Sequence, residues 1–220
     1  MMDPQSKAPE NDLKFAFSTG VSVECFAVPA DTYIKNHPII TQDGIAVPLV
    51  GVSAYVIDAG TVHQQSPRML LIQRAASDSL PNRWEVPGGA CDAEDPSILY
   101  SCARELWEEA GLAATEIGLR VGEPLIFLTR SGRLICKIGF LVKTARATRN
   151  QGEEGQLRVK IDPKEHQNNV WASEEEVRSE RMGDLELTFT SRDQKQTILQ
   201  AFEIWKERGE SGLKATAPGE

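Results

Sequence analysis

The chain has 220 residues, which is enough for one well-buried core but too few to suggest two full-sized domains. Its hydrophobic fraction of 40% and charged fraction of 25% are ordinary for a soluble globular protein, so they argue against a disordered or membrane-spanning chain. The formal net charge of −8 argues against stable binding to duplex nucleic acid. If carboxylates of this chain bind a phosphate-rich ligand, divalent cations must lie between the carboxylates and the phosphates, because like charges repel.

The two ends of the chain differ in composition from its middle. Residues 1–13 and 207–220 are polar and contain proline or glycine, so we expect two flexible tails around a single domain at residues 14–206. The four cysteines form no CxxC pair, which argues against a zinc ribbon or a redox motif. The N-terminus lacks the apolar core of a signal peptide, and no run approaches the ~20 apolar residues of a membrane helix. We therefore expect a cytoplasmic protein without a membrane partner.

Between the tails, short apolar runs rich in Val, Ile and Phe alternate with turn signals, which is typical of strands. In chain order, the predicted strands are Val21–Val28, Val47–Asp58, Met69–Arg74, Leu119–Thr129, Arg133–Thr144 and Leu157–Ile161. Residues 14–46 are interpreted as an N-terminal β extension, and Ser131-Gly132 predicts a hairpin turn. The predicted helices are Ser97–Ala110, Ser191–Glu207 and a short one after Ser173. This order predicts an α/β fold in which helices pack on the faces of a mixed sheet.

The segment at residues 88–112 carries the chemical signal. It is predicted to form a loop, a helix and a loop, because Ser97 is a natural N-cap and Gly111 lies where a left-handed C-terminal cap would fall. The apolar stripe that would face the core consists of Leu99, Cys102, Leu106 and Ala110. Glu105, Glu108 and Glu109 are spaced so that their carboxylates share a neighbouring face, where they repel each other unless cations or an arginine compensate.

Hard divalent cations such as Mg²⁺ or Mn²⁺ are typically held by a few carboxylates together with substrate phosphates, which fits this acidic face. The alternative is a solvated helix face that happens to be acidic, and for the three glutamates alone this is the better explanation. The flanking residues favour the metal site instead. Tandem glycines precede the helix, Arg104 immediately precedes Glu105, and Gly111-Leu112 follows, which makes a long spaced pattern.

This pattern resembles the Nudix box, usually written as Gly, five residues, Glu, seven residues, Arg-Glu-apolar-x-Glu-Glu-x-Gly-apolar. The matching residues are Gly89, Arg104, Glu105, Leu106, Glu108, Glu109, Gly111 and Leu112. The loop departs from the family pattern in two ways. The sixth position after Gly89 is Asp95 rather than Glu, and eight residues rather than seven lie between Asp95 and Arg104. Either Glu94 or Asp95 stands in for the usual first glutamate.

The resemblance implies a Nudix hydrolase with an α/β/α sandwich around a mixed β-sheet and with Mg²⁺ or Mn²⁺ as cofactor. Such an enzyme cleaves the pyrophosphate bond of a nucleoside diphosphate derivative; ADP-ribose, nucleotide sugars, dinucleoside polyphosphates and nucleoside triphosphates all remain open. By the same resemblance, Glu108 and Glu109 are principal metal ligands, and Glu105 is a ligand or orients the base. The Gly89 carbonyl is a further ligand, and Arg104 fixes the glutamates through salt bridges.

Matches outside the box extend the resemblance to roughly residues 47–205. Upstream, a strand ending in Gln-Arg leads to a Trp-x-x-Pro-Gly-Gly turn, so Arg74 is a candidate phosphate contact or a plain surface arginine, and Trp84 is expected in the core. Downstream, Glu165 lies in the acidic loop before a Trp-bearing strand. It is a candidate metal ligand or general base, or a solvated loop residue, whereas we expect a non-catalytic role for His166.

The rival hypothesis is a catalytically lapsed Nudix module that binds a nucleotide or a protein partner without turning it over. The irregular loop at Asp95 favours it, and the three retained glutamates argue against it. A homodimer is also compatible with the sequence, because Leu125–Leu128 is apolar enough to pair across subunits, although core packing explains this run equally well.

Overall fold

The computed structural model describes residues 15–59, 66–129, 131–145 and 157–208. The strands are β1 Ser18–Thr19, β2 Leu49–Asp58, β3 Arg68–Arg74, β4 Trp84–Glu85, β5 Ala114–Leu128, β6 Leu134–Thr144, β7 His166–Ser173, β8 Arg181–Met182 and β9 Leu185–Glu186. The helices are the 3₁₀ helix η1 Val21–Phe26 and the α-helices α1 Ala30–Asn36, α2 Ile98–Ala110, α3 Glu174–Ser179 and α4 Arg192–Arg208. No helix among these residues is long and apolar enough to cross a membrane.

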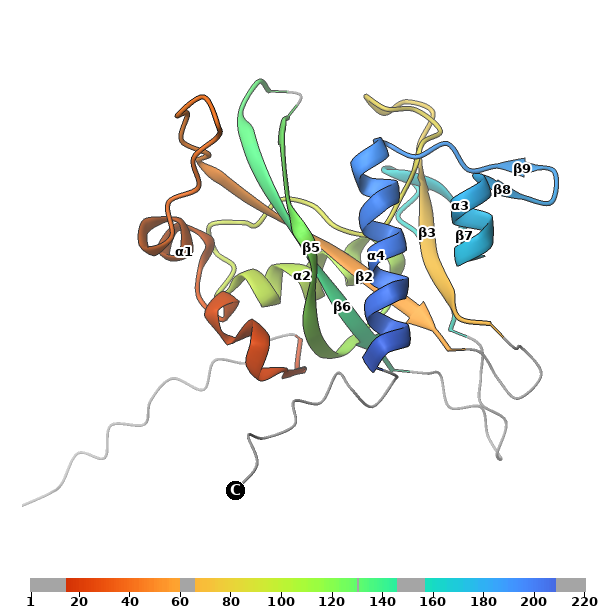
Figure 1. Ribbon diagram of the computed structural model, residues 1–220, viewed down its shortest axis with the longest axis horizontal. Coiled ribbons are helices and arrows are strands. Elements are labelled where there is room, and N and C mark those ends of the chain that lie inside the picture. Colours follow the sequence, from red (N-terminus) through yellow and green to blue (C-terminus); the bar gives the residue numbers. More distant parts are fainter. Residues whose placement is uncertain (1–14, 60–65, 130, 146–156, 209–220) are drawn as a thin grey trace, which may run out of the picture.

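Seven strands form one mixed sheet in the order β1-β5-β6-β2-β3-β4, with β7 paired to β3 (Figure 1). β2 and β6 run parallel, as do β1 and β5, whereas β5–β6 and the pairs made by β3 are antiparallel. β8 and β9 form a separate two-stranded hairpin. The predicted mixed sheet is therefore confirmed.

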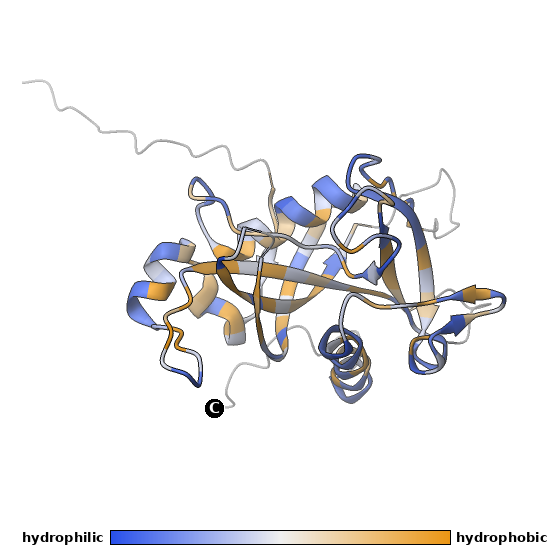
Figure 2. Ribbon diagram, turned by 90° about the horizontal axis from the view of Figure 1, so that it is seen from above, coloured by the Kyte–Doolittle hydropathy of each residue, from blue (hydrophilic) through white to orange (hydrophobic). Residues whose placement is uncertain are grey.

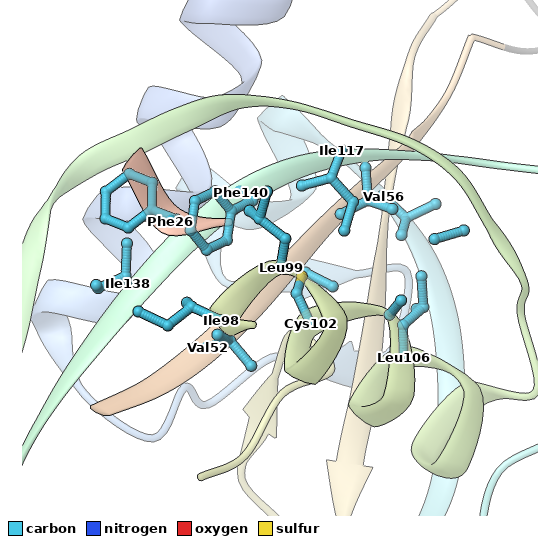
Figure 3. Close-up of a cluster of buried hydrophobic side chains, with 14 of the residues drawn as sticks. Phe26, Val52, Val56, Ile98, Leu99, Cys102, Leu106, Ile117, Ile138 and Phe140 are labelled. Atoms are coloured by element: carbon cyan, nitrogen blue, oxygen red, sulfur yellow. The ribbon is translucent and has the colours of Figure 1, made fainter. Parts of the chain in front are cut away.

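Helices cover both faces of this sheet, which makes the fold an α/β/α sandwich. Along β3, Leu70 and Ile72 pack into the core beneath α2, while Met69 and Leu71 pack into a second core beneath α4. In Figure 1, α4 runs in front of the sheet and α2 lies behind it, and Figure 2 shows α4 end-on on one side of the sheet. Figure 3 shows the apolar side chains of α2 against those of β2 and β6.

Local signals in the sequence set both ends of α2. The Ser97 hydroxyl accepts a hydrogen bond from the Tyr100 amide at 3.0 Å, and Gly111 ends the helix with a φ of 65°. The short helix α3 begins with a capping box between Ser173 and Glu176. The hairpin turn is also confirmed, since Gly132 has a φ of 74° and its amide bonds to the Thr129 carbonyl.

The strand predicted at Val21–Val28 is wrong, because this segment is the 3₁₀ helix η1. Its buried residues, Val23 and Phe26, are three positions apart, which matches the three residues per turn of a 3₁₀ helix rather than the alternation of a strand. Residues 15–46 accordingly contain η1, α1 and the two-residue β1 instead of the expected β extension.

The strand predicted at Leu157–Ile161 is also wrong, because these residues form no ladder. The Lys160 amide donates instead to the Ala110 carbonyl at the end of α2. This segment thus satisfies a helix terminus rather than a neighbouring strand. The tails predicted at residues 1–13 and 207–220 lie outside the described residues, except that α4 continues to Arg208.

Candidate active site

A cavity of about 410 Å³ lies where α2, the loop after β4, the end of β3 and the loop before β7 meet. Its lining residues are Arg74, Gly88, Gly89, Glu105, Glu108, Glu109, Asp162 and Glu165. Segments far apart in the sequence, from Arg74 at the end of β3 to Glu165 in the loop before β7, therefore converge on one acidic cavity.

The three glutamates of α2 reach this cavity from different depths. The Glu108 side chain is 53% exposed, whereas those of Glu105 and Glu109 are 12% and 9% exposed. Burial raises the pKa of the Glu109 carboxyl well above its usual range, and burial also raises the pKa of Glu105. A cation between these carboxylates would favour their ionised forms, so the electrostatics of the cavity suit a cation.

The two glycines before α2 hold the turn against these carboxylates. The Gly88 amide donates to Glu109 Oε2 at 2.6 Å, with a φ of 147° at Gly88. A Cβ on Gly89 would lie 2.6 Å from Glu105 Oε2, so a side chain at this position would displace the Glu105 carboxylate. The Gly89 carbonyl accepts from the Val52 amide at 2.8 Å, which fixes its orientation beside β2.

Arg104 does not line the cavity, but its guanidinium forms ion pairs with acidic side chains of α2 and of the loop before α2. Its guanidinium donates to Glu105 Oε1 at 2.8 Å and to Glu108 Oε2 at 2.9 Å. It also donates to Asp95 at 2.9 Å, and Asp95 is buried and accepts from the Ser101 hydroxyl. Arg104 therefore pairs with two of the three glutamates, Glu105 and Glu108, and with Asp95.

Of the two candidates for the outer acidic position, Asp95 is the one that contacts Arg104. Its carboxylate contacts Arg104 from within the loop, whereas Glu94 is exposed and forms no hydrogen bond with the described residues. Burial alone would raise the pKa of Asp95, but the hydrogen bond and charge of Arg104, together with Ser101, lower it.

Arg74 lines the cavity but is already engaged by protein carboxylates. It forms ion pairs with Asp78, at 2.6 Å, and with the buried Glu85. A phosphate that reached Arg74 would thus share its guanidinium with these two carboxylates. The sequence did not identify Glu85 as part of the site.

Lys137 on β6 is a second residue that the sequence analysis missed. Its ammonium donates to the Gly88 carbonyl at 2.9 Å, and its charge opposes the burial that raises the pKa of Glu109 and of Glu105. Asp162, which lines the cavity, was missed as well. Neither residue belongs to a motif, so no local signal marked them.

Glu165 and His166 approach Glu109 from the loop before β7 and from its first residue. Glu165 is exposed and lines the cavity, whereas His166 is 1% exposed. The imidazole Nε2 lies 3.5 Å from Glu85 Oε1 and 4.0 Å from Glu109 Oε1. One potential ligand atom from each of Glu109, Glu165 and His166 falls within 4.8 Å of the other two.

Comparison with known proteins links this architecture to a family. The model of the NUDIX domain matches residues 48–192, whereas no curated protein sequence is significantly similar to the chain. Two solved structures resemble the fold. For the NUDIX domain of Shewanella oneidensis NrtR complexed with ADP ribose, the identity is 19%, the coverage 79% of this chain and 96% of that one, and the TM-score 0.52. For the MutT protein of Methanosarcina mazei, the identity is 20%, the coverage is 72% of this chain and 95% of that chain, and the TM-score is 0.50.

Proposed function

This chain belongs to the NUDIX family of hydrolases, and we propose that it cleaves the pyrophosphate bond of a nucleoside diphosphate linked to another group, in a reaction that depends on a divalent metal. The observation that carries the proposal is the convergence of Glu105, Glu108 and Glu109 on one cavity beneath the Gly88-Gly89 turn. A solvated acidic helix face would not bury Glu109 to 7% exposure.

The oxygen donors of this cavity fit Mg²⁺ or Mn²⁺, which are bound through carboxylates and carbonyl groups. Glu105, Glu108 and Glu109 would hold the ion, with the Gly89 carbonyl oxygen as a further ligand. When bound, such an ion neutralises the diphosphate and lowers the pKa of a bound water. The raised pKa of Glu105 and of Glu109 supports this assignment, because both shifts come from burial that a cation would offset.

The remaining residues position this machinery. Arg104 holds Glu105 and Glu108 against Asp95, and Lys137 holds the Gly88-Gly89 turn through the Gly88 carbonyl. Both side chains act on the glutamates or on the turn, and neither lines the cavity. They are therefore positioning residues.

Arg74 and Glu165 line the cavity from the end of β3 and from the loop before β7. Glu165 supplies an exposed carboxylate close to Glu109, which suits either metal binding or removal of a proton from the attacking water. Arg74 offers a guanidinium to a substrate phosphate, although its pairs with Asp78 and Glu85 weaken the attraction.

The substrate is a small nucleoside diphosphate derivative, and ADP-ribose is the first compound to test. A NUDIX domain of similar fold is known in complex with ADP ribose, which supports this choice. Nucleotide sugars, dinucleoside polyphosphates and nucleoside triphosphates complete the panel. A cavity lined by acidic residues fits such ligands only when cations accompany the phosphates.

The test is release of phosphate, after coupling to a phosphatase, from this panel with Mg²⁺ or Mn²⁺. We expect turnover by the native protein and a loss of at least ~100-fold in Glu109→Gln, because removal of one charge-stabilising group costs about 10²–10³ in kcat. Glu175→Gln is the matched control, since Glu175 is exposed on α3. Absence of turnover on every compound, with nucleotide binding retained, would instead identify a binding module.

A further inference from the structure

A second cavity, of about 590 Å³, lies between α3, the loop before α4 and α4 itself, and Arg83 from the loop before β4 completes its lining. We call it the α3–α4 cavity. It shares no lining residue with the candidate active site. In Figure 1, α4 lies in front of the sheet, whereas α2, which lines the candidate active site, lies behind it. The volume falls within the roughly 300–1,000 Å³ of small-molecule sites.

Positive charge gathers in this cavity, although the net charge of the chain is −8. Its charged lining residues are Arg83, Arg178, Arg192, Lys195, Glu180 and Glu203. Two of the four cations already have carboxylate partners. The Lys195 ammonium lies 2.5 Å from Glu180 Oε1, and the Arg178 guanidinium lies 2.8 Å from Glu174 Oε1. The remaining two cations, both guanidinium groups, decide which ligand the cavity attracts.

Arg83 and Arg192 have no carboxylate partner within the part of the chain that the structure describes. The Arg83 guanidinium reaches only the Phe189 carbonyl, at 3.5 Å. Arg192 follows three residues after Phe189 and is the first residue of α4, where the helix dipole disfavours a cation. Glu203 lies eleven residues further along α4, about 16 Å from Arg192 along the helix axis, so it does not neutralise this end of the cavity.

Two guanidinium groups that start from neighbouring backbone suit an oxyanion, because each planar fork can donate paired hydrogen bonds to phosphate oxygens. A phosphate ester, with a charge of about −1.5 to −2 at pH 7, balances both groups, whereas a single carboxylate balances one. A phosphate ion alone would leave much of the cavity unfilled. The lining also includes the apolar side chains of Phe189 and Leu199, which suit the organic part of a ligand.

We propose that the α3–α4 cavity binds a small organic phosphate, with Arg83 and Arg192 as the groups that hold its phosphate. The site goes beyond the proposed hydrolase reaction and does not rest on it, because the two cavities have no lining residue in common. It also differs in what it needs. The acidic candidate active site accepts phosphates only together with cations, whereas the α3–α4 cavity supplies the positive charge from its own side chains.

The test is isothermal titration calorimetry of the full chain with AMP and with inorganic phosphate, in EDTA so that no divalent cation assists the candidate active site. We expect AMP to bind the native protein more tightly than inorganic phosphate does. Arg83→Gln and Arg192→Gln should each weaken AMP binding by at least ~10-fold, because each removes hydrogen bonds to a charged group. Arg133→Gln is the matched control and should bind AMP as the native protein does, since Arg133 is exposed on the β5–β6 hairpin, outside the cavity.

Backbone amide chemical shifts of the native protein locate the bound AMP without any substitution. AMP should shift the amide signals of Thr188 and Arg192 and leave those of Gly88 and Gly89 in place. Shifts confined to Gly88 and Gly89, or equal AMP affinity in all three variants, would overturn the site. Equal affinity for AMP and inorganic phosphate would overturn the organic ligand and assign the cavity to free phosphate. If neither compound binds in EDTA, the inference fails, while release of phosphate in the metal-dependent assay would leave the hydrolase assignment standing.

Discussion

Replacement of Gly88 by alanine tests the turn that holds the buried glutamate. An added Cβ at Gly88 would lie 2.1 Å from the Val52 carbonyl oxygen and 2.8 Å from the Ser53 Cα, so the backbone of the turn must move away from β2. The φ of 147° is a conformation that costs other residues about 1–3 kcal/mol. Movement also breaks the Gly88–Glu109 hydrogen bond, which is worth about 1.5–3 kcal/mol when one partner is charged.

We therefore expect Gly88→Ala to lower the free energy of unfolding by at least ~3 kcal/mol, a large part of the 5–15 kcal/mol of a typical domain. Urea titration followed by circular dichroism measures this loss. Gly183→Ala is the matched control, because Gly183 has a φ of 59° but open space around its Cβ position. It should lose only about 1–2 kcal/mol, which is the cost of the left-handed conformation. Equal losses in the two variants would refute the role given to close packing at Gly88.

Three further predictions concern charged residues around the cavity. Asp95→Ala should cost on the order of 3 kcal/mol of stability in urea titrations, because it removes a buried partner of Arg104. Since the folded-state pKa of Asp95 is lowered, its contribution is present above about pH 4 and is lost on acidification, so the penalty should shrink toward pH 3; a constant penalty would contradict this. Glu109→Gln should stabilise the metal-free protein at pH 7, because burial raises the pKa of Glu109 and its ionisation opposes folding. The gain should vanish below about pH 4, and a destabilised metal-free variant at pH 7 would contradict it. Lys137→Met should lower stability by about 1–2 kcal/mol through loss of its hydrogen bond to Gly88, and an unchanged urea midpoint would exclude this role.

The part of the site on α2 was predictable because its determinants are local. Ser97 and Gly111 set the ends of the helix, the apolar stripe sets the buried face, and helix geometry then places Glu105 and Glu109 side by side. The same local logic holds for α3, where Ser173 and Glu176 form a capping box. Such elements need no knowledge of distant contacts.

Lys137 could not be predicted, because its place in the site depends on sheet register. It pairs with Gly51 across β2 and β6, and Gly51 in turn forms a bridge with Ala90, which brings Lys137 beside the Gly88-Gly89 turn. The sequence around Lys137 shows only a buried strand. Register between strands almost 90 residues apart is not encoded in any short motif.

The error at Val21–Val28 has a related cause. Val and Phe favour strands only when a neighbouring strand and a face to bury are available. Here Val23 and Phe26 instead fill the core beneath α2 from a 3₁₀ helix. His166 shows the same limit within the site, since its burial against Glu109 depends on the pairing of β7 with β3.

The most direct test of the central claim is ³¹P nuclear magnetic resonance of a nucleoside diphosphate derivative such as ADP-ribose, incubated with the protein and Mg²⁺ or Mn²⁺. The diphosphate signals should be replaced by two phosphomonoester signals with the native protein and should persist with Glu109→Gln. Unchanged diphosphate signals across the whole panel, with nucleotide binding retained, would contradict the assignment of a pyrophosphate hydrolase.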